Sequence, residues 1–443
     1  MNIGLSEHFT YKKLMKFTLP TIIMMIFTSI YGVIDGIFVS NCVGSDAFAA
    51  VNLIMPAIMI LGTVGFMIGT GGSALVSKTI GEGDKEKANR FFSMLIYLLT
   101  IVGFVLTILG VILIAPMAKL LGADESMLQD CIVYGRTLLM FLVPFCLQNA
   151  FQSFLIVAEK PTFGLIISIV SGISNMILDF LLIYVFKMGV FGAALATGIS
   201  QVIGVIIPLV YFIKKKNHIL QFTKTKFELK PIMQSCANGS SEMLTNLSMS
   251  LVNMLFNMQL MKYIGSDGVV AFGIIMYVGF IFSGTYLGYS IGSAPIVGYH
   301  YGAENKDELK SLLKKSIILI AVTSLVMTGL AEILSKLLAS IFVSYDESLL
   351  RITTTAIRLF STSYIISGFN IFASSFFTAL NNGVVSAAIS FMRTLVFQII
   401  MIYLLPAIWG INGLWLAVTF AELLALFVSI MFFIKNKKKY QYA

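Results

Sequence analysis

Long runs of apolar residues, separated by short polar segments, recur along the whole chain. Twelve of these runs are long enough to cross a bilayer, for which about 20 predominantly apolar residues are needed. We therefore predict an all-α integral membrane protein with 12 transmembrane helices. The expected spans cover residues 13–40, 48–77, 90–118, 131–158, 161–186 and 190–213 in the first half, and 231–263, 268–299, 311–338, 349–380, 384–408 and 411–434 in the second.

The polar segments between these spans repeat at a fixed distance. Gly44-Ser45-Asp46 returns as Gly265-Ser266-Asp267, and Gly81 returns as Gly302, each after 221 residues. A fixed period over a whole chain indicates duplicated structural units. Because each half carries six spans, both halves enter the membrane from the same side and the repeat is parallel. We expect two six-helix lobes over residues 1–213 and 231–443, joined by a cytoplasmic linker over 214–230.

Composition supports the membrane assignment and explains the positive charge. Hydrophobic residues make up 58% of the chain and charged residues 12%, against about 45–50% and 25% in soluble domains. Most of the 30 Lys and Arg residues fall in segments that share one side of the membrane if the N-terminus is cytoplasmic. The positive-inside rule then places both termini in the cytoplasm. The net charge of +9 thus reflects the orientation of the helices in the membrane. We expect contacts with lipids and none with nucleic acid.

The motifs of several enzyme classes are missing from the sequence. It contains no phosphate-binding loop that ends in Gly-Lys-Ser/Thr, no Ser-His-Asp order and no zinc-ligand spacing. The glycine-rich stretch 69–72 lies inside an apolar run, where close helix packing is the better interpretation. His8, His218 and His300 all fall at cytoplasmic margins. We expect neither enzymatic activity nor a cofactor.

Two aspartates inside the predicted spans are the strongest functional candidates. Charged side chains at membrane depth cost about 2.5–3.5 kcal/mol on insertion scales, so each one indicates a function by default. At 1.5 Å per residue, Asp35 lies about 28 Å above Lys16, and Asp179 lies about 27 Å above Pro161. Since both helices run in the same direction, the two carboxylates share a level in the outer half of the first lobe.

Polar neighbours complete this predicted site. Asn175 lies one turn below Asp179 on the same helix face, Thr197 reaches a comparable level in the next span, and Tyr31 stands one turn below Asp35. Two carboxylates with amide and hydroxyl oxygens suit either a shared proton or a small hard cation such as Na⁺. The alternative is that the two aspartates are separate structural residues.

Three further charged residues, Arg393, Glu422 and Glu242, also lie inside predicted spans. Arg393 and Glu422 lie at similar depths on adjacent antiparallel helices, which favours a structural ion pair. Glu242 follows Gly239-Ser240-Ser241 and has no apparent cation partner. It is either a second cation site, a substrate-facing anion or a solvated cavity residue.

Three segments stand out: 66–83, which reads FMIGTGGSALVSKTIGEG, 393–422 near the end of the chain, and VIDGIFVS around Asp35. The first resembles the signature after span 2 of the multidrug and toxic compound extrusion (MATE) transporters, and the second resembles its second-half counterpart. The third resembles the first helix of that family. The likeness covers essentially the whole chain.

This resemblance implies a V-shaped antiporter of a bacterial or archaeal cytoplasmic membrane, which we expect to act as a monomer. It exports amphipathic, often cationic drugs and toxic compounds in exchange for H⁺ or Na⁺, by alternating access of the two lobes. The DinF-like and MepA-like prokaryotic branch fits best, because no carboxylate stands in the middle of span 10, where the NorM-like branch carries one. The positions that match the family's cation site are Asp35, Asn175, Asp179 and Thr197, with Tyr31 and Asn149 nearby, Gln152 as a further cavity candidate, and Pro20 as the residue at which helix 1 bends.

Two other functions remain open. A lipid-linked oligosaccharide flippase, or another lipid flippase of the same superfamily, also pairs six-helix lobes. Such a protein is expected to line its cavity with several basic residues, whereas only Arg393 lies deep here. A non-transporting membrane receptor or scaffold is the alternative from another class, and it leaves the shared-depth carboxylates without a role.

Overall fold

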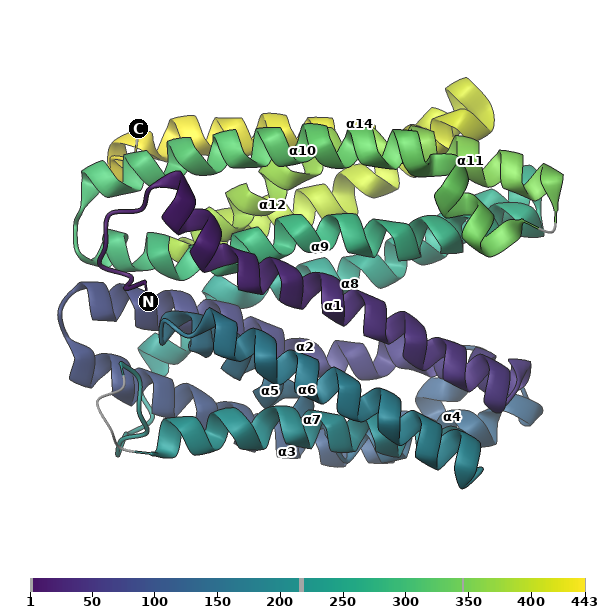
Figure 1. Cartoon of the computed structure of the whole chain (residues 1–443), viewed down its shortest axis with the longest axis horizontal. Helices are drawn as coiled ribbons and strands as arrows, with labels where there is room; N and C mark the ends of the chain where they lie inside the picture. The colour runs from purple at the N-terminus through teal and green to yellow at the C-terminus, as the bar shows by residue number, and fades with distance from the viewer. Residues whose placement is uncertain (1–2, 215–218, 345, 443) are drawn as a thin grey trace.

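The computed structural model describes residues 3–214, 219–344 and 346–442, and all regular secondary structure in these residues is helical. The first half contains α1 (Tyr11–Cys42), α2 (Ser45–Gly81), α3 (Lys85–Leu120), α4 (Glu125–Leu139), α5 (Leu142–Val157), α6 (Pro161–Asp179), the π-helix η1 (Phe180–Val185) and α7 (Gly189–Ile213). The second half contains α8 (Leu229–Ile264), α9 (Ser266–Gly302), α10 (Lys306–Val343), α11 (Glu347–Ser361), α12 (Tyr364–Ala379), α13 (Gly383–Phe391), the π-helix η2 (Met392–Val396) and α14 (Phe397–Tyr440). The long helices run side by side along the molecule (Figure 1).

These helices form the twelve predicted spans, although several spans are not single helices. The fourth span is broken into α4 and α5, which meet at an angle of 52°. The last two spans are separated by Gly410, whose φ of +59° reverses the chain inside α14. By length and composition alone, eight helices of the described residues qualify as membrane-spanning, or nine with the bent pair. The fold is a twelve-helix, two-lobe membrane bundle.

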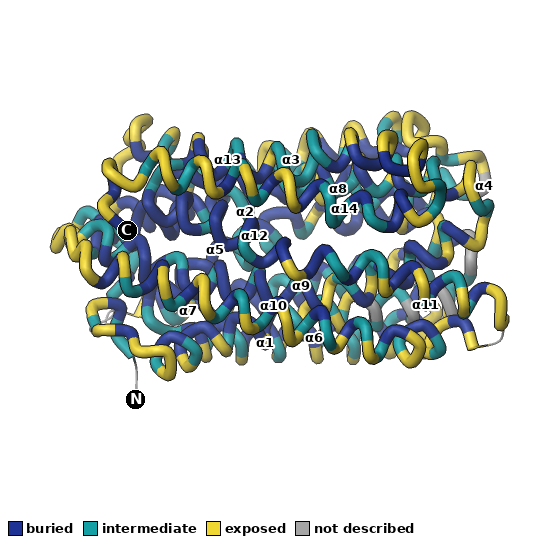
Figure 2. The backbone as a smooth tube through the Cα atoms, turned by 90° about the horizontal axis from the view of Figure 1, so that it is seen from above, coloured by how far each residue is buried: buried dark blue, intermediate teal, exposed yellow. Residues whose placement is uncertain are grey.

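Each half has its own apolar core, and the two lobes meet along two matching helix pairs. Buried residues concentrate on the inner helices, and exposed ones outline the rim (Figure 2). Across the lobe boundary α1 packs on α9, and α8 packs on α2. The repeat-related glycines 81 and 302 meet reciprocally: a Cβ on Gly81 would lie 2.0 Å from the Tyr299 carbonyl oxygen, and one on Gly302 would lie 2.0 Å from that of Lys78. The interface therefore preserves the symmetry of the duplication.

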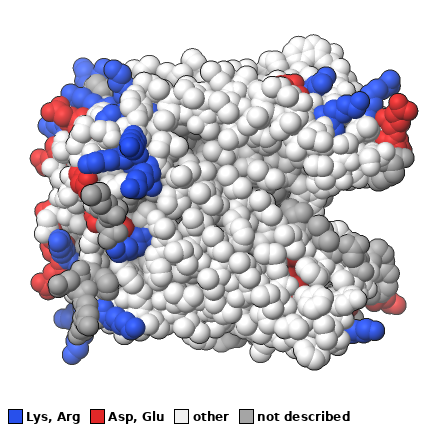
Figure 3. Space-filling model, viewed as in Figure 1, with Lys and Arg blue, Asp and Glu red and all other residues white. Residues whose placement is uncertain are grey.

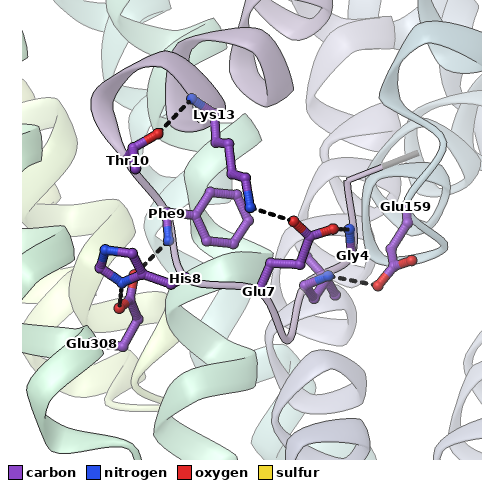
Figure 4. Close-up of polar contacts among 9 residues, drawn as sticks. Gly4, Glu7, His8, Phe9, Thr10, Lys13, Glu159 and Glu308 are labelled. Carbon is purple, nitrogen blue, oxygen red and sulfur yellow. Dashed lines mark hydrogen bonds and ion pairs between the residues drawn. The ribbon is translucent and has the colours of Figure 1, made fainter. Parts of the chain in front are cut away.

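The N-terminal segment connects the two lobes at the end of the molecule where both termini lie (Figure 4). The Leu5 N–H donates to the Glu159 carboxylate of the first lobe at 2.6 Å. In the second lobe, Glu308 accepts from the Phe9 N–H at 2.9 Å and contacts the His8 ring at 2.6 Å. Burial is the main cause that raises the pKa of Glu159, and the Leu5 N–H opposes this shift.

The opposite end of the molecule is open. Figure 3 shows a notch between the lobes at the end away from the termini, whereas most blue side chains gather at the end that holds both termini. A cavity of about 390 Å³ opens there between α1, α2 and α9. A second cavity, of about 330 Å³, lies in the second lobe and shares the α9 residues Phe280, Ser283 and Leu287 with the first. The notch and the first of these cavities form a cleft between the lobes at the end away from the termini.

Candidate functional site

Close contact between α1 and α6 creates the setting of the predicted site. Gly172 permits this contact, because a Cβ there would lie 2.6 Å from the ring of Phe27 and 3.2 Å from that of Tyr31. One turn further along both helices, α1 carries Asp35 and α6 carries Asn175. The absence of one side chain thus lets polar groups of two helices converge inside the membrane.

The two aspartates come together at this level. The Asp35 and Asp179 carboxyl groups lie close enough for each to influence the charge of the other, although no hydrogen bond joins them in this structure. Asp179 has no exposed surface. Asp35 is only partly buried and lines the cavity of about 390 Å³. The pair therefore joins a buried carboxyl group to one that faces the cleft.

Unpartnered polar atoms surround the pair. Within the described part of the chain, both carboxylate oxygens of Asp179 and one of Asp35 are buried without a hydrogen-bond partner. The same is true of the Asn175 amide oxygen and nitrogen and of the Thr197 hydroxyl. Ser171 Oγ donates to the Ser200 carbonyl at 2.7 Å, which sets the register of the antiparallel helices α6 and α7 and brings Thr197 opposite Asn175.

This set of atoms has the chemistry of a site for a proton or a small hard cation. Buried polar groups are almost always hydrogen-bonded, so a cluster of unpartnered ones needs an explanation such as a bound ion. Carboxylate, amide and hydroxyl oxygens are the ligands that hard cations prefer. The described residues contain no group of three or more His, Cys, Asp or Glu that would suit a transition metal.

The helix that carries Asp179 changes its winding directly after this residue. The α-helix α6 ends at Asp179, and the π-helix η1 follows from Phe180 to Val185. In the second half, the π-helix η2 contains Arg393. Short π-helices are rare in proteins, and those that occur often lie at functional sites.

Two further polar residues of the first lobe were not predicted from the sequence. Tyr134 on α4 is 1% exposed and lies within electrostatic range of both aspartates. Gln201 lies one turn beyond Thr197, and its side-chain oxygen is buried without a described partner. The spacing of four residues from Thr197 was an available signal for Gln201. No comparable signal marked Tyr134, because its position depends on the break between α4 and α5.

Two predicted cavity residues lie outside this cluster. The Asn149 amide donates to the Phe145 carbonyl of its own helix at 2.8 Å. The Gln152 amide donates to Ser168 Oγ at 3.1 Å. In this conformation both half-buried side chains are held by hydrogen bonds within the first lobe. Pro20 lies inside α1, which continues as one helix from Tyr11 to Cys42.

Arg393 and Glu422 form a buried polar network in the second lobe. Arg393 Nε donates to Glu422 Oε1 at 2.8 Å, and Glu422 is 2% exposed. The other carboxylate oxygen accepts from the Asn370 amide at 2.7 Å, and Ser429 Oγ donates to Asn370 at 3.0 Å. Both carboxylate oxygens of Glu422 thus accept a hydrogen bond, whereas neither carboxylate oxygen of Asp179 does.

Glu242 lies within electrostatic range of Arg393, but among the described residues Arg393 forms its ion pair with Glu422. Arg393 comes near Glu242 because η2 packs against α8, although the two are far apart along the chain. Glu242 also faces a small polar space at the lobe boundary, together with Thr70, Ser73 and Ser153 of the first lobe and Ser375 and Thr378 of the second.

The chain is similar to known proteins along most of its length. The MatE family model matches residues 20–181 and 242–404. The chain is 24% identical to the multidrug export protein MepA of Staphylococcus saprophyticus, over 93% of this chain and 91% of that protein. It is 24% identical to MepA of Staphylococcus haemolyticus, over 97% and 95% of the two chains.

Solved structures show the same fold. A MATE crystal structure in complex with MaL6 superposes with a TM-score of 0.93 at 23% identity, covering 98% of both chains. A MOP superfamily transporter from Pyrococcus furiosus, described as having a binding pocket of reversed polarity, gives a TM-score of 0.91 at 23% identity and covers 98% of both chains. The chain therefore belongs to the MatE family, whose members are multi-pass secondary transporters rather than enzymes.

Proposed function

We propose that this protein exports amphipathic, often cationic compounds in exchange for H⁺ or Na⁺, and that the coupling ion binds between Asp35 and Asp179. The observation that carries this proposal is the cluster of buried oxygens without partners around these two aspartates. A proton or a hard cation satisfies these oxygens, whereas an empty site leaves them at the cost of lost hydrogen bonds.

The position of Asp35 supports a route for the ion. Its side chain lines the cleft cavity, and Asp179 lies behind it with no exposed surface. An ion that enters from the cleft meets Asp35 first and reaches Asp179, Asn175 and Thr197 next. The same cavity includes Met25, Met55 and Phe280, which offer adaptable apolar walls to a substrate.

The charge distribution supports an orientation of the protein in the membrane. If the basic end that holds both termini faces the cytoplasm, the cleft opens to the outside, and the tight contacts around Gly81 and Gly302 close the cytoplasmic side. Ion uptake in this state would lower the affinity of the cleft for a cationic compound, and rocking of the lobes would then reset the transporter. One elementary charge that moves through 100 mV supplies about 2.3 kcal/mol, enough to drive a substantial gradient.

Pro20 provides a means of linking the ion site to helix movement. It lies one helix length below Asp35 on α1 and removes one backbone hydrogen bond there. We propose that α1 bends at Pro20 as the charge of the Asp35 pair changes. The multidrug export proteins named MepA, which match along nearly their whole length, support export as the direction of transport.

The test uses purified protein in liposomes loaded with a fluorescent cation. A pH gradient and a Na⁺ gradient are imposed separately, and efflux is followed over time. We expect one of the two gradients to drive efflux against the concentration difference. If neither gradient drives movement of any of several amphipathic cations, the antiporter proposal is wrong.

A further inference from the structure

A groove on the membrane-facing surface runs between α1 and α10, with α9 as its floor. Its volume is about 310 Å³. Leu19 on one wall and Val322 and Val326 on the other are 45%, 56% and 51% exposed, so the groove opens to the surroundings of the bundle. The surface lies on a different face of α1 from the cleft that holds Asp35.

The lining of the groove suits a hydrocarbon chain. The two floor tyrosines have their hydroxyls bonded within the protein: Tyr289 to Ser316 Oγ at 2.8 Å and Tyr286 to the Tyr364 carbonyl at 3.0 Å. Neither hydroxyl is left to attract water or a polar ligand. The walls consist mainly of Leu, Ile, Val and Met side chains.

The length of the groove matches one leaflet of a bilayer. On α1 it extends from Met15 to Ile26, which corresponds to about 16 Å at 1.5 Å per residue. This is roughly half of the hydrocarbon thickness of about 30 Å. The groove therefore accommodates one acyl chain that enters from the end where the termini lie.

Lysines stand at the entrance. Lys12 precedes Met15 and Leu19 on the same helical stripe, and Lys16 lies one turn before Leu19. On α10, Lys315 lies one turn before the wall residue Leu319, and its ammonium donates to the Phe9 carbonyl at the start of α1. The acidic residues nearby are already engaged, since Glu7 pairs with Lys13 at 2.6 Å and Glu308 binds His8 and Phe9. The entrance thus presents uncompensated positive charge at headgroup level.

We propose that this groove is a binding site for an anionic glycerophospholipid, with one acyl chain between α1 and α10 and the phosphate near Lys12 and Lys16. The lipid would touch Leu19, which directly precedes Pro20, and Ile22, two residues after it, and would therefore brace α1 against α9. This site does not depend on the proposed exchange reaction, because it involves neither the cleft nor the aspartate pair.

Quenching by brominated lipids tests this site directly. A tryptophan introduced as Val322→Trp, in a background with Trp409→Phe and Trp415→Phe, reports lipid at the groove rim. Phe427→Trp is the matched control: it lies on α14, is 73% exposed, and stands eight residues from Lys435, as Val322 stands seven from Lys315. Each variant is reconstituted in mixed phosphatidylcholine and phosphatidylglycerol vesicles in which one of the two lipids is brominated.

We expect brominated phosphatidylglycerol to compete better than phosphatidylcholine at Val322→Trp, and this preference to fall about fivefold for each lysine removed in Lys12→Gln and Lys12→Gln/Lys16→Gln. The preference at Phe427→Trp should stay unchanged in the same variants. Equal quenching by both lipids at Val322→Trp would overturn the anionic site. Weak quenching at Val322→Trp by either lipid, with normal quenching at Phe427→Trp, would show that something other than lipid fills the groove.

Native mass spectrometry of the unmodified protein provides a second readout. Retained phosphatidylglycerol should decrease in Lys12→Gln/Lys16→Gln and stay unchanged in Lys435→Gln/Lys437→Gln. The opposite result, a loss only in the second variant, would place the bound lipid at the C-terminal lysines and contradict the proposal.

Discussion

At the scale of single residues, Asp179 and Glu422 show two ways of placing a carboxyl group inside a membrane bundle. Glu422 has partners for both oxygens, Arg393 and Asn370. Asp179 is equally buried but has no described hydrogen-bond donor for either oxygen. An unpaired buried anion is costly, so Asp179 favours a proton or a cation nearby. The first arrangement is suited to stability and the second to exchange.

The Glu422 network leads to a stability prediction. Glu422→Leu should lower the free energy of unfolding by about 3–5 kcal/mol, because it leaves the Arg393 charge buried without its partner. The double variant Glu422→Leu/Arg393→Met should recover most of this loss. Equilibrium unfolding in mixed micelles with a denaturing detergent measures both values. A double variant as unstable as the single one would show that the ion pair is not the reason for the loss.

The residues of the candidate site were predictable to different degrees. Asp35 and Asp179 could be matched by counting residues from the predicted helix starts, because a helix rises by a constant amount. Tyr134 could not be found this way, since the chain bends by 52° between α4 and α5, and the hydropathy pattern contains no sign of this bend. Arg393 as a neighbour of Glu242 depends on the packing of η2 against α8, which no local pattern reveals.

At the scale of helices, close approach of backbones determines where the lobes touch. The two contacts that involve Gly81 and Gly302 join the ends of α2 and α9. The glycine-rich stretch of α2 has a similar role, because a Cβ on Gly71 would lie 1.9 Å from the Ser235 carbonyl oxygen of α8. These helices can close one end of the molecule only while such positions lack side chains.

Replacing one of these glycines should prevent closure. Gly302→Leu is expected to abolish transport while leaving the lobes folded, because the new side chain would collide with the backbone at Lys78. Distances between spin labels on the loops at the basic end should increase in this variant. Gly273→Ala is the control, since a Cβ at Gly273 meets no atom within 4 Å. Unchanged distances in Gly302→Leu would contradict the assigned closure contact.

The predicted spans agree with the observed helices at nearly all positions, because apolar length is a strong signal for membrane helices. Helix α8 shows the limit of this signal. It is not among the apolar helices found by composition, since it carries Asn238, Ser241, Glu242 and Asn246. Asn238 donates to Asn381 and Ser241 contacts Thr378 within the second lobe, whereas Glu242 and Asn246 line cavities. The polarity of α8 therefore reflects contacts inside the protein rather than contact with lipid. The π-helices η1 and η2 were not predictable, because they depend on tertiary packing.

At the scale of the whole molecule, a symmetric scaffold carries an asymmetric site. The pair α1 and α9 is the symmetric counterpart of the pair α8 and α2. The positions that the repeat aligns with Asp35 and Asp179 are Phe256 and Met401, which are 1% and 9% exposed in the core of the second lobe. On the proposed mechanism the duplication supplies two lobes that rock against each other, and the aspartate pair that we propose for the coupling ion belongs to the first lobe alone.

The N-terminal segment adds a contact that the symmetry does not require. Glu308→Ala should release it from the second lobe, because the Phe9 N–H and the His8 ring lose their shared acceptor. Hydrogen exchange of the Phe9 amide, followed by mass spectrometry, should become at least tenfold faster. Asp307→Ala is the control, because Asp307 is exposed and directly precedes Glu308. Hydrogen exchange of the Phe9 amide should stay slow in this variant. Equal exchange rates in the two variants would mean that the segment is held by other contacts.

The most direct test of the central claim compares two transport modes in Asp35→Asn. Gradient-driven efflux requires the coupling ion, whereas exchange of labelled for unlabelled substrate across liposomes requires only the cleft and the movement of the lobes. We predict that Asp35→Asn loses gradient-driven efflux and retains substrate exchange. The control Glu332→Gln, which alters a carboxylate bonded to Ser361 in the second lobe, should keep both modes. Gradient-driven efflux at the wild-type rate in Asp35→Asn would contradict the claim that the coupling ion binds at this aspartate.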